Sequence, residues 1–321
     1  LWSLDQLQGA SATYNMAVAV YLEGQLDTQA LRQSLVALIS RHQPLHTVTS
    51  EDNDGNPVGR LVDIPSSDEV LSTIDLSTDF AADPTQTQAT LQAMIESQVA
   101  VPFDLQHDIP LRGQLTITSK DSAILLLTLH HHAGDAVSTN IIATELEQAY
   151  LSYRSGNAPD WRPLAVQYSD WALWQHLTLE SNITCKLERA RLRLVDMPEL
   201  LTLPVDRPRT AKRDRRAGYL SVSIPALTVQ QLEQLACEQG TTLFTVVLTA
   251  YAATLGRIAG QNDVVIGVPV TGRNHTALEK VVGFLLNTLA IPISMDRGCT
   301  GVSLIERTRK SVEANINDQD L

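Results

Sequence analysis

A short apolar run that ends in three consecutive histidines constrains the fold of this chain more than any other feature. Residues 125–129 read Leu-Leu-Leu-Thr-Leu, and His130, His131 and His132 follow them directly. An apolar run this short, entered from a polar turn, is typical of a strand that is buried on both faces. The sequence therefore predicts a strand at residues 122–129 that carries imidazoles from the interior to the edge of a sheet.

The residues after the histidines predict a turn followed by a helix. Gly134 and Asp135 favour the turn, and Ser138 can cap a helix that we expect to begin near Thr139 and to stop at Gly156. Ligands of layered α/β proteins commonly bind where strands end. Because an imidazole changes its charge near neutral pH, the histidines are candidates for chemistry at that edge.

The three histidines should divide between the two faces of the strand. Side chains of an extended strand alternate, so His131 should point away from His130 and His132. A competing interpretation is a zinc site on the face that His130 and His132 share. No nearby cluster of Asp, Glu or Cys offers a third ligand, and no His-Glu-x-x-His motif occurs, so we expect no metal.

Composition limits the class of protein. The 321 residues are 44% hydrophobic and 19% charged, which favours a globular chain of about two domains. A net charge of −12 argues against nucleic acid or a membrane surface as the main partner. Three scattered cysteines offer no disulfide framework, and no run is long and apolar enough to span a membrane. We expect a soluble, cytoplasmic protein.

Several segments together resemble the condensation domain of nonribosomal peptide synthetases, in the wider group of acyltransferases folded like chloramphenicol acetyltransferase. The most specific motif is His-His-x-x-x-Asp, which His130, His131 and Asp135 supply. The other motifs are Arg-His-Gln-Pro-Leu-His-Thr at residues 41–47, Tyr-Ser-Asp-Trp-Ala-Leu-Trp at 168–174, Pro-Val-Thr-Gly-Arg at 269–273 and Gly-Phe-Leu-Leu-Asn-Thr at 283–288. The resemblance covers essentially the whole chain.

The resemblance implies a layered α/β fold with two chloramphenicol acetyltransferase-like lobes in a V-shaped pseudo-dimer. We expect the first lobe at residues 1–162, an interlobe helix and linker at 163–218, and a partial second lobe at 219–321. Six basic residues between 207 and 216 predict a solvated linker, or alternatively a docking patch for an acidic carrier protein. Residues 317–321 resemble the start of the sixth motif, so we expect a chain truncated at its C-terminus and poorly active when isolated.

The resemblance also assigns roles to the motif residues. His131 would lie in a tunnel where a carrier-bound acyl thioester meets a carrier-bound amine, and would act as general base or as a hydrogen-bonding partner of the amine. His130 is expected to be packed rather than reactive, and Asp135 to organise the loop. Gly134 and Asn287 are candidate substrate-binding residues. No cofactor of the domain's own is implied, because partner carriers supply phosphopantetheine covalently and an adjacent adenylation domain loads them.

Two positions depart from the family pattern. His46 stands where we expect the family's arginine partner of Asp135, and Ala136 replaces a glycine, which would be strained if the position requires a positive φ angle. These departures keep alternatives open. The chain could be a stand-alone or epimerising relative of the same fold, or a non-catalytic platform that recruits carriers or tailoring enzymes.

Overall fold

The structure is a computed structural model that describes residues 1–82, 84–207, 220–296 and 298–320. Backbone contacts divide the chain into two compact units. The first contains Leu1–Trp174 and Arg273–Leu285, and the second contains Gln175–Gly272 and Leu286–Leu321. The long helix α7 (Tyr168–Leu194), which the sequence assigns to the interlobe region, contributes residues to both units.

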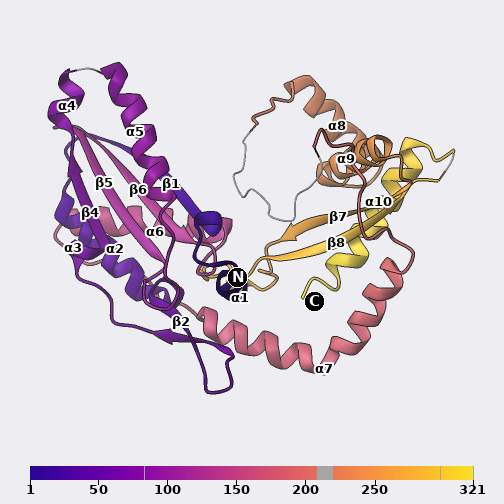
Figure 1. Cartoon of the computed structure of the whole chain (residues 1–321), viewed down its shortest axis with the longest axis horizontal. Coiled ribbons are helices and arrows are strands. Elements are labelled where there is room, and N and C mark those ends of the chain that lie inside the picture. Colours follow the sequence, from indigo (N-terminus) through magenta and orange to yellow (C-terminus); the bar gives the residue numbers. More distant parts are fainter. Residues whose placement is uncertain (83, 208–219, 297, 321) are drawn as a thin grey trace. The chain divides into compact units, whose positions relative to one another are not determined.

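The first unit is built on a four-stranded sheet of order β1-β6-β5-β4 (Figure 1). Strand β6 (Ser122–His130) lies antiparallel between β1 (Asn15–Glu23) and β5 (Leu111–Ser119), while β4 (Leu71–Asp75) runs parallel to β5. All residues of β6 after Ser122 are buried. The predicted buried strand that ends at the histidines is therefore confirmed.

Two helices pack against one face of this sheet. Asp27 precedes a stretch in which Leu31, Leu35 and Leu38 fall on one helical face, so the sequence predicts a helix capped by Asp27. Helix α2 (Thr28–Arg41) confirms this, because the Asp27 side chain accepts a hydrogen bond from the Ala30 backbone N–H. Helix α6 (Ala136–Arg154) lies beside it, and the two helices and the sheet share one core. That core includes Leu35, Leu38, Ile39, Leu125, Leu127, Leu129, Ile142 and Leu146.

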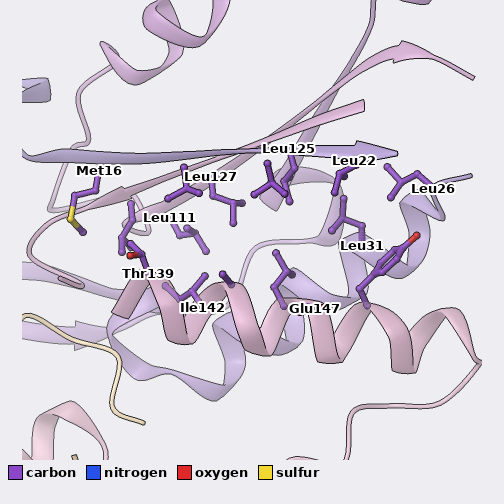
Figure 2. A pocket seen from close by; sticks show the side chains of 16 residues that line it. Met16, Leu22, Leu26, Leu31, Leu111, Leu125, Leu127, Thr139, Ile142 and Glu147 are labelled. Atoms are coloured by element: carbon purple, nitrogen blue, oxygen red, sulfur yellow. The ribbon is translucent and has the colours of Figure 1, made fainter. Parts of the chain in front are cut away.

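A cavity of about 390 Å³ lies between α6 and the inner face of the strands. Figure 2 shows Leu125 and Leu127 of β6 directed across it toward Ile142 of α6. β1 is the edge strand, and its inward-facing Val18 and Val20 are still 40% and 37% exposed. The helix layer therefore covers the centre of the sheet better than the β1 edge.

Smaller elements complete the first unit. Strands β2 (Thr47–Glu51) and β3 (Pro57–Leu61) form the predicted hairpin, with Gly55 at a φ of 80° in its turn. Residues 66–87 are rich in Ser, Asp and Thr and predict a surface connection before a helix at residues 88–99, and this expectation was wrong. This region contains α3 (Ser67–Val70), strand β4, α4 (Ser77–Ala82) and the start of α5 (Pro84–Val99). The sequence did not predict β4, because its first residues do not alternate between apolar and polar. Leu71 is fully buried, but both Ser72 and Thr73 are polar and exposed.

The second unit packs helices α9 (Leu243–Ala259) and α10 (Gly301–Ile316) on a two-stranded sheet. The strands are β7 (Asp263–Val270) and β8 (Asn287–Ser294), and they run antiparallel. A core of aliphatic side chains joins the sheet to both helices: Leu248, Ala252, Leu289, Ile291, Ile293, Leu304 and Val312. The apolar stretch at residues 242–259 predicts a helix, and α9 confirms it. The Thr242 hydroxyl caps this helix by accepting from the Thr245 N–H.

The sequence predicts a strand at residues 219–224 and a capping box at residues 228–231, and both expectations were wrong. Residues 220–224 form no strand, and residue 219 lies outside the described residues. The predicted capping box at Thr228 is absent, because α8 (Ala226–Glu238) begins earlier, after Pro225, with Thr228 inside its first turn. The basic stretch lies outside the described residues from position 208 to 219.

Among the described residues, no single helix is long and apolar enough to cross a bilayer. Helices α8 and α9, which are bent by 105° relative to each other, have the required length and composition only when taken together.

Leu35 of α2, which is fully buried, provides a test of the core of the first unit. We expect Leu35→Ala to lower the free energy of unfolding by about 2–5 kcal/mol, because it removes buried methyl groups and leaves a cavity. All four tryptophans lie within residues 1–174, so their fluorescence during urea unfolding reports on this unit. The control Leu151→Ala, at a position of α6 that is 55% exposed, should change stability by less than about 0.5 kcal/mol. Equal losses for the two variants would contradict the assigned core.

Candidate active site

The backbone of the histidine segment is held from both sides. The His130 N–H donates to the Pro110 carbonyl at 2.9 Å, and the His131 N–H donates to the Tyr14 carbonyl at 2.8 Å. The Ala133 N–H then bonds back to the His130 carbonyl at 3.0 Å and closes the turn. The three imidazoles therefore project from a backbone that is fixed by hydrogen bonds along neighbouring segments.

The ring of His131 has a defined tautomer. Its Nδ1 lies 2.8 Å from the Gly134 carbonyl oxygen. A carbonyl oxygen can only accept, so Nδ1 carries the proton and Nε2 of the neutral ring keeps its lone pair. Phe284 packs against the imidazole in an edge arrangement, with ring centroids 5.0 Å apart at 89°. His131 is partly exposed, and no described residue bonds to its Nε2, so this nitrogen can accept a proton or a hydrogen bond.

His130 and His132 share the opposite side, as the alternation of a strand predicts. Their Nδ1 atoms lie 3.0 Å apart, so one ring donates to the other. His130 is 3% exposed and also packs edge-on against Phe103 and Tyr14. Burial lowers the pKa of His130 to about 3, with a further contribution from the other two imidazoles, and burial lowers the pKa of His132 to about 4. His130 is thus a packed ring that stays neutral near pH 7, and its predicted structural rather than reactive role stays a prediction.

The zinc alternative receives no support from this geometry. The two Nδ1 atoms that would face a metal are hydrogen-bonded to each other. In the described ranges no group of three or more His, Cys, Asp or Glu side chains is placed to hold a metal ion.

Asp135 caps helix α6 and anchors a distant segment. Its Oδ1 accepts from the backbone N–H and from the hydroxyl of Ser138, both at 2.9 Å. Its Oδ2 accepts from Arg273 Nη1 at 2.7 Å and from the Leu285 N–H at 3.3 Å. Burial opposes ionisation, but the bonds from Arg273 and Ser138 outweigh it and hold the pKa of Asp135 below its usual value. Both oxygens accept from groups other than His131, whose Nδ1 bonds to the Gly134 carbonyl instead. The geometry therefore favours the predicted loop-organising role of Asp135 over that of a triad acid, and this role stays a prediction.

Three expectations about this loop are corrected. The helix begins at Ala136 with Asp135 as its cap, rather than near Thr139 with Ser138 as cap. His46 does not contact Asp135, because its Nδ1 bonds to the Val62 carbonyl at 3.1 Å and Arg273 takes the place of the expected arginine. No residue other than glycine has a positive φ angle among the described residues, so Ala136 fits its helical position without strain.

Gly134 has a steric role as well as a carbonyl that fixes His131. A Cβ atom at this position would lie 2.7 Å from Leu129 Cδ2 and 3.1 Å from Ser138 Cβ. A side chain here would therefore push the turn away from the strand end or displace the start of α6. The assignment of Gly134 as a substrate-binding residue stays a prediction.

Asn287 belongs to the second unit, at the first position of β8. Its side-chain Nδ2 donates to the Gln319 carbonyl at 2.8 Å, and its Oδ1 accepts from the Thr288 N–H at 2.8 Å. The amide therefore ties β8 to the segment after α10. Its proposed contact with the acceptor substrate stays a prediction.

Sequence reasoning missed the residues that support the site from a distance. Arg273, Gly283 and Phe284 stand inside quoted motifs, but neither spacing nor composition shows that they surround the start of α6. Tyr168 belongs to the same group, since its hydroxyl donates to the Phe284 carbonyl at 3.2 Å. These contacts join residues more than 100 positions apart, which is why the sequence alone gave no signal for them.

Comparison with known proteins identifies the family. The family model described as "Condensation domain" matches residues 1–321. The chain belongs to the condensation domain family. Condensation domains are acyltransferases that form amide bonds in nonribosomal peptide synthesis, and they typically have no cofactor of their own.

Relatives in curated proteins are much longer than this domain. The chain is 37% identical to the probable non-canonical nonribosomal peptide synthetase CymA of Salinispora arenicola, 36% to the isonitrile lipopeptide synthase of Mycobacterium tuberculosis and 35% to the phosphinothricin tripeptide synthetase PhsB of Streptomyces viridochromogenes. Each match covers the whole chain but only 4%, 13% and 26% of the respective relative.

Solved structures confirm the fold. The X-domain from teicoplanin biosynthesis matches the whole chain, and 69% of its own length, with a TM-score of 0.88 at 25% identity. The first condensation domain of the calcium-dependent antibiotic synthetase matches the whole chain, and 73% of its own length, with a TM-score of 0.81 at 20% identity. The expected α/β fold of the chloramphenicol acetyltransferase type is confirmed.

The depressed pKa values of His130 and His132 predict a pH-dependent stability. Each ring resists protonation in the folded protein but takes a proton freely when unfolded, so folding stability should fall as the pH drops from about 6.5 toward 4. We expect up to about 1.4 kcal/mol of loss per pH unit for each ring. His132→Gln should reduce this loss when urea unfolding is compared at pH 7 and pH 5.

The exposed His107 supplies the control, because His107→Gln removes a histidine whose side chain is 75% exposed. Its pH dependence should match that of the unmodified protein. Identical slopes for the unmodified protein and His132→Gln would show that the buried pair does not control acid stability.

Proposed function

We propose that this domain joins a carrier-bound acyl or peptidyl thioester to a carrier-bound aminoacyl group. In this proposal His131 accepts a proton or a hydrogen bond from the attacking amine. The observation that carries this proposal is the bond from His131 Nδ1 to the Gly134 carbonyl, which leaves an unprotonated Nε2 on a partly exposed ring. Such a nitrogen can take the proton of an attacking ammonium or hydrogen-bond the amine in the tetrahedral intermediate.

The reaction balances without a cofactor bound by the domain. The amine nitrogen forms a bond to the thioester carbonyl carbon, and the carbon–sulfur bond breaks. The amine proton passes through His131 Nε2 to the departing thiolate, which is the phosphopantetheine thiol of the donor carrier. The partners are therefore a donor carrier, an acceptor carrier and the adenylation domain that loads them.

A second candidate is a platform that recruits other proteins. It is favoured by the likeness to the X-domain from teicoplanin biosynthesis, which has been solved in complex with OxyB and matches 96% of this chain with a TM-score of 0.85. Two arguments for this alternative no longer hold. Arg273 supplies the cation that His46 was thought to replace, and Ala136 is unstrained. The intact geometry around His131 therefore favours the enzyme.

We expect His131→Ala to lower dipeptide formation by about 10²–10⁴-fold, the usual contribution of a positioned general base. The measurement uses the full-length synthetase with both carriers loaded, and detects the product by mass spectrometry. His107→Ala serves as the matched control at an exposed histidine. Equal product from His131→Ala and the unmodified protein would rule out the role of His131, and no product from any of the proteins would favour the platform.

A further inference from the structure

Ser138 is a buried hydroxyl in the first turn of α6 that contacts three other residues. It is fully shielded from solvent. Its Oγ lies 2.9 Å from Asp135 Oδ1, 3.0 Å from the Gly283 carbonyl oxygen, 3.1 Å from the Gly283 backbone nitrogen and 3.1 Å from Arg273 Nη2. The hydroxyl thus lies beside both backbone polar atoms of Gly283, which is 145 positions away in the sequence.

The hydrogen-bonding capacity of this hydroxyl is fully used. A serine hydroxyl has one proton to donate and two lone pairs that accept. The Gly283 N–H and Arg273 Nη2 can only donate, so they occupy both lone pairs. The single proton then goes to Asp135 Oδ1 or to the Gly283 carbonyl. A buried hydroxyl in this arrangement is a rigid connection rather than a solvent-facing group.

The connection fixes the backbone next to Phe284. On one side, Ser138 holds Gly283; on the other side, the Leu285 N–H bonds to Asp135 and the Phe284 carbonyl accepts from Tyr168. The ring of Tyr168 also occupies the space where a Cβ of Gly283 would lie. The position of the Phe284 ring is therefore determined on both sides by the start of α6 and by Tyr168.

Phe284 is the second restraint on the His131 imidazole. The hydrogen bond to the Gly134 carbonyl fixes one ring nitrogen, but a ring held at a single atom can still tilt or rotate about its side-chain bonds. The edge contact of Phe284, at 5.0 Å and 89°, removes that freedom. Any displacement of residues 283–284 would change the direction in which Nε2 points.

We propose that Ser138 is a positioning residue for His131, which acts by fixing the Gly283–Phe284 peptide so that the Phe284 ring holds the imidazole with Nε2 available. This inference rests on the proposed function of His131. Its consequence is specific. Removing the hydroxyl should lower kcat more than it changes KM, because substrate still binds while the accepting nitrogen is misdirected.

The test combines three variants assayed for dipeptide formation in the full-length synthetase. We expect Ser138→Ala to lower kcat by about tenfold or more, which corresponds to about 1.4 kcal/mol of lost transition-state stabilisation. Phe284→Leu keeps every bond of Ser138 and should lower kcat to a similar degree. The control Thr139→Ala removes the next hydroxyl of the same turn, which donates to the Ala136 carbonyl within its own helix, and should leave kcat unchanged.

A double-mutant cycle separates positioning from a general loss of stability. If Ser138 acts through Phe284, the double variant should be no worse than the more damaging single variant. Additive losses in kcat would overturn the proposal. Tryptophan fluorescence checks that each variant folds. If Ser138→Ala does not fold, an unchanged kcat for Phe284→Leu would still overturn the proposal.

A spectroscopic readout distinguishes this inference from the proposed function. In protein labelled with ¹⁵N-histidine, the His131 signals, assigned by their loss in His131→Asn, should report a protonated Nδ1 and a free Nε2. Ser138→Ala should shift them toward a mixture of states, whereas unchanged signals would overturn the positioning role. Changed signals with unchanged kcat would support the positioning role and refute the base role of His131.

Discussion

The ion pair between Asp135 and Arg273 is the interaction on which the arrangement of this site depends. Their side chains are 2% and 5% exposed, and the distance between Oδ2 and Nη1 is 2.7 Å. Two charges are costly to bury unless the remaining polar atoms are satisfied as well. Here Ser138 and two backbone N–H groups complete the coordination of the carboxylate. One carboxylate thus caps α6, fixes residues 273–285 to the sheet unit and determines where the loop after the histidines can go.

The histidine motif separates structural from chemical roles by means of the alternation of a strand. The buried His130 and the partly buried His132 form a hydrogen-bonded neutral pair, whose low pKa values keep charge away from the interior near neutral pH. His131 lies on the other side, where one nitrogen is committed to a backbone carbonyl and the other is left to accept. Consecutive residues of one chemical type thereby acquire different environments, because the side that each faces decides its solvation and its partners.

Some parts of this structure could be predicted from local sequence, and others could not. The buried strand, the Asp27 cap and the hairpin turn at Gly55 depend on neighbours within a few residues, so composition and spacing were sufficient. Strand β4 was missed because it has five residues and pairs with β5, about forty positions later. The cap of α6 was assigned to Ser138 instead of Asp135, because both residue types can cap a helix. Only the folded loop shows that the Asp135 carboxylate, and not the Ser138 hydroxyl, accepts from the free N–H group at the start of the helix.

The sequence by itself determined the family, the strand that carries the histidines and the side on which each histidine lies, because ordered motifs and a two-residue period are local properties of the chain. Only the tertiary structure decided the partner of Asp135, the tautomer of His131 and the supporting roles of Ser138 and Phe284. These depend on contacts between α6 and residues 273–285, which meet only after the chain has folded. Burial then decides which of several possible polar partners is used, since each buried donor and acceptor must be paired.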